Sequence, residues 1–436
     1  MPRRIIWFTL AGIATAAFLA FTVQADTLVQ GEGLATCVKV EGALVEETKA
    51  GFKQIKPGQK IPAETLVVGL PEADLVTSDG KCEIRLLVYI GEELPVTEAA
   101  VIFHTSVDKV PEFTLDRGVV AVKNVVKAEK GVAVVRIRAG KQSWEITLRD
   151  PGSEVLVARF GRHEPGTKLF QGGPKKEFVD EPQMHFGVLV VKGHAVVNTG
   201  THTYAMTAPP GPAMAAWDSA TGLEIKRLES MPEEVRNLEP AETEKFKEIC
   251  VITSKLASGD IGKGIDELLA SDNVSKRRVA VACMGAFDDL PRLWAAMENA
   301  KHEDVREQAI HTMRNWIGRK PGQLTKLQDQ LTKEKKYSAV QIRTITTLLR
   351  GFDDTDRREP VIYQLLIDSL EVAPLPIRQL AHWHLERLAP AGQKIAYDAG
   401  ADEAARRRAA EQWRQLIPSG QLPPPPPKKD DVKKGK

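Results

Sequence analysis

The chain has 436 residues, of which 42% are hydrophobic, and its formal net charge is +2. This hydrophobic fraction is ordinary for a globular protein, and the length indicates two or three domains. A nucleic-acid binder needs a surplus of basic charge to displace counterions. The near-neutral balance therefore argues against that class, and we expect no nucleic-acid partner.

The N-terminus has the pattern of a secretory signal peptide. Arg3 and Arg4 precede the uncharged, mostly apolar run Ile5–Val23, and small residues lead to a cleavage position after Ala25. We expect residues 1–25 to be removed and the protein to be exported, to the periplasm or outside the cell. The alternative is an uncleaved anchor, because Ile5–Val23 is just long enough to cross a bilayer.

Four cysteines are present, and none has the CxxC or Cys/His spacing of a metal site. In an oxidising compartment, Cys37 with Cys82 and Cys250 with Cys283 are candidate disulfides. The alternative is four buried free thiols, and the sequence does not decide between the two.

Residues 26–225 are predicted to form an all-β domain. Hydrophobic and polar residues alternate in 132–139, 143–149 and 154–160, which is typical of half-buried strands. Glycine-containing turn signals separate such segments at hairpin spacing. They occur at 116–118, 129–131, 139–141, 150–152, 192–193 and 198–200. The pattern predicts an antiparallel sandwich, barrel or β-roll.

After a linker at 226–242, the hydrophobic period becomes helical from 243 to 417. Four segments share an arginine, a small residue three positions later, and bulky apolar residues one and two turns beyond. They are Arg277, Ala280, Met284 and Phe287; Arg306, Ala309, Met313 and Trp316; Arg343, Thr346, Leu349 and Phe352; and Arg378, Ala381, Leu385 and Leu388. The small residue allows close helix approach, and we expect an α-solenoid of about four stacked helix pairs.

The arginine of each unit is expected to reach acidic groups near the neighbouring turn, such as Asp304. A closing helix over 402–417 is predicted to cap the last unit. The Pro- and Lys-rich segment 418–436 has a composition typical of a disordered tail.

Two family resemblances follow from these patterns. Phe113–Val120, with supporting segments Leu75–Thr77 and Phe186–Val191, resembles the FecR-type domain of envelope proteins, which implies a twisted β-roll. The helical half, with Asp304–Ala309 as its best match, is similar to HEAT repeats. The combination resembles exported envelope proteins of bacteria such as planctomycetes.

The histidines do not predict a metal site. His382 and His384 lie two apart on a helix and so point in different directions, and we expect one packed beside Trp383 and the other solvated. His185, His194 and His202 are expected on neighbouring strands without converging. His104 and His163 are expected at the surface or at strand ends.

Two loops also have simpler structural explanations. Asp353–Asp356 resembles part of a calcium loop but lacks its central glycine and its bidentate acid, so we expect a turn before Pro360. Ser258–Gly264 lacks the Walker spacing and is expected to be a flexible inter-helix loop. Arg406–Arg408 is expected to be a solvated face. We therefore predict no catalytic, cofactor-binding or metal-binding residues.

These observations predict a non-enzymatic, exported binding or scaffold protein that binds an envelope protein through a groove of the helical repeats. The first alternative is a membrane-tethered, FecR-like sensory or regulatory protein. The second is a carbohydrate-active or hydrolytic enzyme with a sheet face that includes Trp144, Trp217 and Tyr204.

Overall fold

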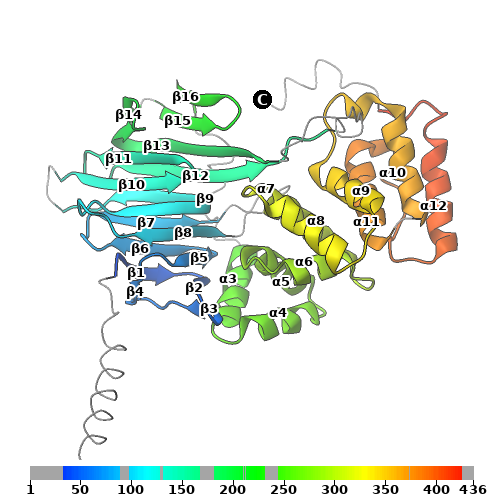
Figure 1. Cartoon of the computed structure of the whole chain (residues 1–436), viewed down its shortest axis with the longest axis horizontal. Helices are drawn as coiled ribbons and strands as arrows, with labels where there is room; N and C mark the ends of the chain where they lie inside the picture. Colours follow the sequence, from blue (N-terminus) through cyan, green and yellow to red (C-terminus); the bar gives the residue numbers. More distant parts are fainter. Residues whose placement is uncertain are drawn as a thin grey trace, which may run out of the picture.

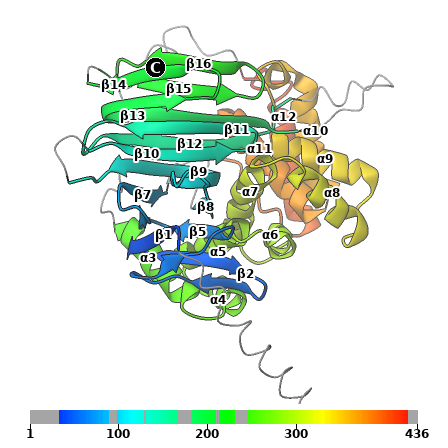
Figure 2. The same ribbon diagram turned by 60° about the vertical axis from the view of Figure 1, so that its left-hand side comes forward.

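A β-rich part is followed by a helical part, and the two lie side by side in both views (Figure 1 and Figure 2). The computed structural model describes residues 33–88, 98–127, 131–166, 181–209, 211, 213–230, 244–372 and 374–424. None of the helices in these ranges is long and apolar enough to span a membrane. The predicted signal peptide, including Ile5–Val23, lies outside them.

The described β-rich part contains sixteen strands that are connected by hydrogen bonds into one network, which divides into two sheets that share strands. Their bounds are β1 Ala35–Val40, β2 Ala43–Thr48, β3 Gly51–Gln54, β4 Lys60–Ile61, β5 Leu66–Leu70, β6 Ala73–Thr77, β7 Cys82–Leu87, β8 Ala99–His104, β9 Glu112–Asn124, β10 Ala133–Ala139, β11 Gln142–Leu148, β12 Glu154–Arg162, β13 Gln183–Asn198, β14 Thr203–Ala208, β15 Ala213–Asp218 and β16 Gly222–Arg227. The first sheet has the order β4-β1-β6-β7-β9-β12-β13-β15-β16. The second has the order β3-β2-β5-β8-β9-β10-β11-β13-β14.

Two long strands, β9 and β13, belong to both sheets and join them. Together with β10, β11 and β12 they close a five-stranded ring. The prediction of turns at 116–118 and 192–193 is wrong, because Gly118 (φ 87°) and Gly193 (φ 77°) bend continuous strands where these pass from one sheet to the other. The pairing is antiparallel as expected, except for β9 and β10, which are parallel.

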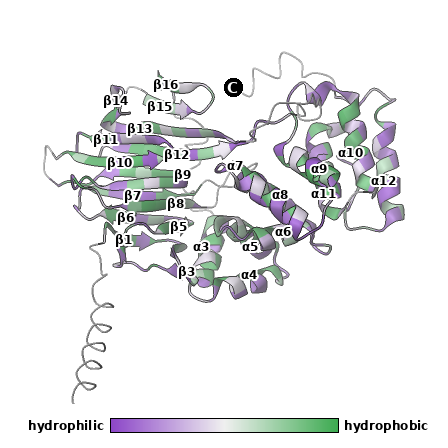
Figure 3. Ribbon diagram, in the orientation of Figure 1, coloured by the Kyte–Doolittle hydropathy of each residue, from purple (hydrophilic) through white to green (hydrophobic). Residues whose placement is uncertain are grey.

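Alternation of burial along the strands builds the core between the sheets. In β11, Trp144, Ile146 and Leu148 are buried while the residues between them are not, and Trp144 packs on Phe186 with ring centroids 4.6 Å apart. The same alternation of hydrophobic and hydrophilic residues is visible along the strands in Figure 3. The outer face of β2, β5 and β8 forms a second apolar cluster with the helices.

All four cysteines are buried free thiols, so the alternative to disulfides is the correct one. Cys37 on β1 and Cys82 on β7 are separated by the intervening strand β6. Two strand spacings amount to roughly 10 Å, which exceeds the reach of a disulfide. Burial raises the pKa of the Cys82 thiol to about 12 and that of Cys283 to about 12, which keeps both protonated and unreactive.

Ten α-helices lie in the described residues after β16. They are α3 Glu244–Ala257, α4 Ile261–Leu269, α5 Val274–Ala286, α6 Leu290–Met297, α7 Glu303–Gly318, α8 Gln323–Lys333, α9 Ala339–Arg350, α10 Pro360–Val372, α11 Leu375–Leu388 and α12 Glu403–Gln415. The four predicted motif segments lie on α5, α7, α9 and α11, which pack against one another in that order. Ala280, Ala309 and Ala381 are fully buried at these contacts.

Arg277 contacts the acidic group of the next helix as predicted, whereas Arg306 has other partners. Nε and Nη2 of Arg277 donate to the two carboxylate oxygens of Asp304 on α7, each over 2.9 Å. Arg306 is 1% exposed and instead bonds Gln379 on α11 (2.7 Å) and Asp398 (2.6 Å) in the chain that follows α11. Arg343 is exposed.

The described chain beyond α12 is packed in part, whereas residues 418–421 are exposed. Leu422, in the segment predicted to be a disordered tail, is 2% exposed and belongs to the apolar core of the helical part. Residues 425–436 lie outside the described residues.

The C-terminal ends of α5, α7 and α9 face the β-rich part, which binds their last carbonyl groups. Arg117 of β9 donates to the Ala286 carbonyl (2.6 Å), His163 to the Ile317 carbonyl (3.2 Å), and the Gly166 amide to the Gly351 carbonyl (3.0 Å). These carbonyls have no partner within their own helices, and the negative end of each helix dipole favours a cation. His163, expected at the surface or at a strand end, directly follows the last residue of β12 and is buried in this junction.

A buried ionic network reinforces the same junction. The Glu98 carboxylate accepts from Arg117 (3.1 Å) and lies 3.6 Å from Arg319, which follows α7. Arg319 also pairs with Asp288 and donates to the Gly285 carbonyl. Burial opposes ionisation of Asp288, but the neighbouring cations, Arg319 first, outweigh it and lower its pKa to about 2.

We predict that Gly318→Ala destabilises the protein by about 1–3 kcal/mol in urea unfolding. A Cβ at Gly318 would lie 2.7 Å from the Gly161 carbonyl oxygen and 2.9 Å from the Arg162 Cα. Both are backbone atoms of β12, so rotation of a side chain cannot relieve the clash. Gly259→Ala is the matched control, because nothing lies within 4 Å of its Cβ. Equal stability of the two variants would contradict tight packing at this junction.

Candidate functional site

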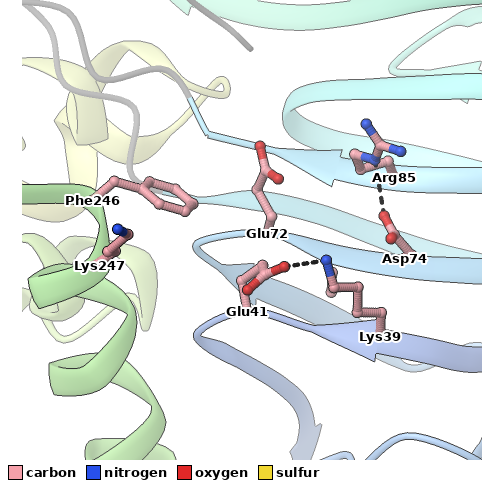
Figure 4. A pocket seen from close by; sticks show the side chains of 8 residues that line it. Lys39, Glu41, Glu72, Asp74, Arg85, Phe246 and Lys247 are labelled. Carbon is pink, nitrogen blue, oxygen red and sulfur yellow. Dashed lines mark hydrogen bonds and ion pairs between the residues drawn. The ribbon is translucent and has the colours of Figure 1, made fainter. Parts of the chain in front are cut away.

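A cavity of about 390 Å³ lies where the outer face of the first sheet meets α3 (Figure 4). Its lining residues come from β1, β6, β7, the turns beside them and the first turn of α3: Lys39, Glu41, Glu72, Ala73, Asp74, Arg85, Phe246 and Lys247. Six of these eight side chains are charged. This composition is unlike the apolar lining of most small-molecule pockets.

Two adjacent turns bring this part of the sheet against α3. The Glu41 amide donates to the Glu72 carbonyl over 2.9 Å, which ties the β1–β2 turn to the β5–β6 turn. A Cβ at Gly42 would lie 2.2 Å from Pro71 and 2.5 Å from Thr253 Oγ1 on α3. Only glycine therefore permits the turn to approach the helix this closely.

Strand register aligns the charges on the sheet side of the pocket. Lys39 on β1 lies opposite Asp74 on β6, and Asp74 lies opposite Arg85 on β7. Asp74 accepts a hydrogen bond from Arg85 Nε at 3.0 Å, and Lys39 forms an ion pair with Glu41. Opposite charges on facing positions stabilise such pairs.

Glu72 differs from the other acids of the pocket. It is 7% exposed, and its Oε1 has no hydrogen-bond partner among the described residues. Burial raises the pKa of the Glu72 carboxyl from 4.5 to about 7, and the Arg85 cation offsets this only in part. The carboxyl therefore changes its charge near neutral pH.

The first turn of α3 adds an aromatic ring and a cation to the pocket lining. Figure 4 shows the Phe246 ring directed toward Glu72, with Lys247 beside it. Lys247 pairs with Glu244 one turn earlier, at 3.4 Å. Burial, and then the charges of Glu41 and Glu72, raise the pKa of the nearby Cys250 to about 11, so this thiol is not a nucleophile near neutral pH.

The two histidines of α11 are both buried, so the expectation that one is solvated is wrong. The Leu348 carbonyl accepts from His384 Nε2 at 2.6 Å, and the His382 ring packs against Tyr397 with the two planes tilted by 43°. Burial lowers the pKa of His382 to about 4 and that of His384 to about 3. Both are therefore neutral core residues, because α11 packs against α7, α9 and α10.

His185, His194 and His202 do not lie on neighbouring strands, contrary to the prediction. His185 and His194 lie on the same strand, β13, and His202 lies in the turn before β14. His185 pairs with Asp218 at 2.9 Å, and His194 pairs with Asp150. Within the described ranges, no group of three or more His, Cys, Asp or Glu residues is placed to hold a metal ion.

The polar loops take up structural roles. Asp353 Oδ1 accepts from the Thr355 and Asp356 amides, which makes 353–356 the turn before α10. Asp260 caps the N-terminus of α4 by accepting from the Lys263 amide, so Gly262–Gly264 is helical and not part of a flexible loop.

The remaining candidates are also packed, at least in part. Arg406 donates to the Ala401 and Glu371 carbonyls, while Arg407 and Arg408 are exposed. Trp144 is 1% exposed, and Trp217 and Tyr204 are partly buried against the same core. The three aromatic residues therefore do not form one open sheet face.

The pocket itself was missed by sequence reasoning, which named no site residue. Its one local signal is that charged residues alternate with apolar ones in Glu72–Ala73–Asp74 and Glu83–Ile84–Arg85. In a strand, this spacing places the charged side chains of each triplet on the same face. The strand register and the contact with α3, far along the chain, are tertiary features that a single sequence does not contain.

Comparison with protein-family models, with curated proteins and with solved structures gave no match. The pocket must therefore be interpreted from its own chemistry.

We predict that Glu72→Gln stabilises the protein above about pH 7 and leaves its stability unchanged below about pH 4.5. The folded carboxyl has the higher pKa, so stability falls as pH rises between the two values and the loss is complete above the folded pKa. A shift from 4.5 to about 7 corresponds to roughly 3 kcal/mol. Glutamine has the shape of the protonated carboxyl and does not ionise, so the variant does not lose this stability as the pH rises.

The measurement is urea unfolding at several pH values, with Glu154→Gln as the control. Glu154 is a half-buried residue of β12 outside the pocket. A stability difference between Glu72→Gln and wild type that does not change with pH would contradict the assignment.

Proposed function

We propose that this chain is a non-enzymatic, exported binding or scaffold protein of the cell envelope, and that the charged pocket between its two parts is a ligand site. The observation that carries the proposal is the buried Glu72 side chain, whose Oε1 has no hydrogen-bond partner among the described residues. A group that destabilises the folded protein near neutral pH is more typical of a functional site than of a structural core.

The packing of the helices supports a HEAT-like array as part of this proposal. α5, α7, α9 and α11 carry the same motif and pack in succession, and the Asp304–Ala309 segment supplies both the partner of Arg277 and a buried small residue. Stacked helix pairs commonly provide protein-binding surfaces. A partner protein bound in a groove of this array stays a prediction.

The FecR-like identity of the β-rich part is likewise a proposal. The Phe113–Val120 segment on which it rests is the part of β9 that bends at Gly118 and joins the two sheets. A twisted arrangement of this kind agrees with the β-roll that the resemblance implies. The proposed role of this part is to hold α3 and the array in place and to supply the strand wall of the pocket.

The two alternatives predict different observations. A tethered sensory protein would retain Ile5–Val23 and sediment with membranes, whereas the exported protein would begin at Asp26 and stay in the soluble fraction. An enzyme would need a nucleophile or a general base beside its ligand. In the pocket, Glu72 is the group whose pKa suits a general base, while the Cys250 pKa is too high for a nucleophile at neutral pH.

The test is retention of small molecules by the purified full-length protein. Wild type, Glu72→Gln and Glu154→Gln are incubated with an aqueous metabolite extract and gel-filtered, and the bound compounds are released and identified by mass spectrometry. We expect a compound that wild type and Glu154→Gln retain and that Glu72→Gln loses by at least tenfold, roughly 1.4 kcal/mol. Equal retention by all three proteins would contradict the proposed site. Conversion of the compound by wild type alone would show an enzyme.

A further inference from the structure

Most charged side chains that line the pocket form ion pairs with described residues, and Glu72 does not. Lys39 pairs with Glu41, Arg85 with Asp74 at 3.0 Å, and Lys247 with Glu244 at 3.4 Å. Each of these pairs is locally neutral. Glu244 lies outside the lining, so within the lining Glu72 is the charged residue that forms no ion pair with the described residues, although the Arg85 cation acts on it at longer range. A positively charged group is therefore the electrostatic complement of this carboxylate.

Hydrogen bonding narrows the class of that cation. Buried polar atoms in folded proteins nearly always have a partner, and Glu72 Oε1 has none among the described residues. An ammonium group can donate one N–H to this oxygen alone, whereas a guanidinium is best satisfied by two coplanar acceptors at once. A quaternary ammonium has no N–H to donate. No described cluster of acids and histidines is placed to hold a metal ion.

The remaining space fits a carbon chain attached to the ammonium. The cavity of about 390 Å³ is larger than a simple cation needs, and the Phe246 ring faces Glu72 across it (Figure 4). An aromatic ring packs against methylene groups and attracts a neighbouring cation.

We propose that the pocket binds a primary alkylammonium group, with the Glu72 carboxylate accepting its hydrogen bond and the Phe246 ring packing against its carbon chain. This assignment rests on the proposed function and specifies its ligand. A free aliphatic amine and the side chain of a lysine residue share this chemistry, and the experiment separates them.

Binding of an ammonium group depends on pH, because it requires the ionised form of Glu72. The charged or titratable groups that face Glu72 are Lys39 of β1, Glu41, Asp74 of β6, Arg85 of β7, and Lys247 with Cys250 of α3. Since the pKa of Glu72 is about 7 and alkylamines stay charged below pH 9, affinity falls roughly a hundredfold from about pH 8 to pH 5.

Isothermal titration calorimetry of the full-length protein tests the proposal with three probes: n-butylamine, Nα-acetyl-lysine amide and n-butanol. We expect n-butylamine to bind wild type and Glu154→Gln, and to bind Glu72→Gln at least tenfold more weakly. Glu72→Asp keeps the charge and should bind the amine more tightly than Glu72→Gln does. n-Butanol, which has the same shape without the charge, should not bind. Tighter binding of the lysine amide than of butylamine would identify a protein side chain as the source.

Two results would overturn the ammonium assignment: equal binding of n-butanol and n-butylamine, or undiminished amine binding by Glu72→Gln. The unfolding curves of Glu72→Gln show separately that the variant is folded. If the metabolite retained in a Glu72-dependent manner is not an amine and n-butylamine does not bind, the assignment fails while the proposed binding function stands.

Discussion

The last carbonyl groups of three helices are hydrogen-bonded by the β-rich part, and the rest of the structure depends on this contact. The ends of α5, α7 and α9 would otherwise bury unpaired acceptors, each of which costs free energy comparable to a lost hydrogen bond. Arg117, His163 and the Gly166 amide satisfy one carbonyl of each helix. Separating the two parts would break these bonds together. The junction therefore holds α3 against the sheet, where the charged pocket forms.

The junction combines apolar and ionic contacts that do different things. The rings of Phe52 and Phe287 pack with their centroids 4.7 Å apart. Burial of apolar surface stabilises the contact between the two parts but does not define their relative orientation. The Glu98, Arg117 and Arg319 network gains little net free energy, because burying three charges carries a large desolvation cost. Its bonds are directional, however, and each arginine also binds a helix carbonyl. The ionic contacts thus define the position of the helical part relative to the sheets.

Local features of the fold could be predicted from the sequence, and tertiary ones could not. The helix motif and the strand alternation are set by residues within one or two turns. The Arg277–Asp304 bond was expected from the repetition of that motif in the next helix pair. Gly118 and Gly193 were misassigned as turns because positive φ suits a tight turn and a strand bend equally. His384 is buried because α11 is surrounded by other helices, which no local pattern of that helix reveals. The pocket depends on strand register and on α3, and so was not predicted.

The position of Glu72 links the stability of the junction to the chemistry of the pocket. The turn that carries Glu72 lies close to α3, because Gly42 approaches both Pro71 of this turn and Thr253 of the helix. The contact that joins the two parts therefore also removes water from the Glu72 carboxyl. Ionising this buried carboxyl near neutral pH costs free energy unless a cation pairs with it. A cation that pairs with it recovers more energy than the same pair would at the surface, where water screens both charges. The pocket is lined by strands of the β-rich part on one side and by α3 on the other. The free energy gained when a cation binds Glu72 therefore also favours contact between the two parts.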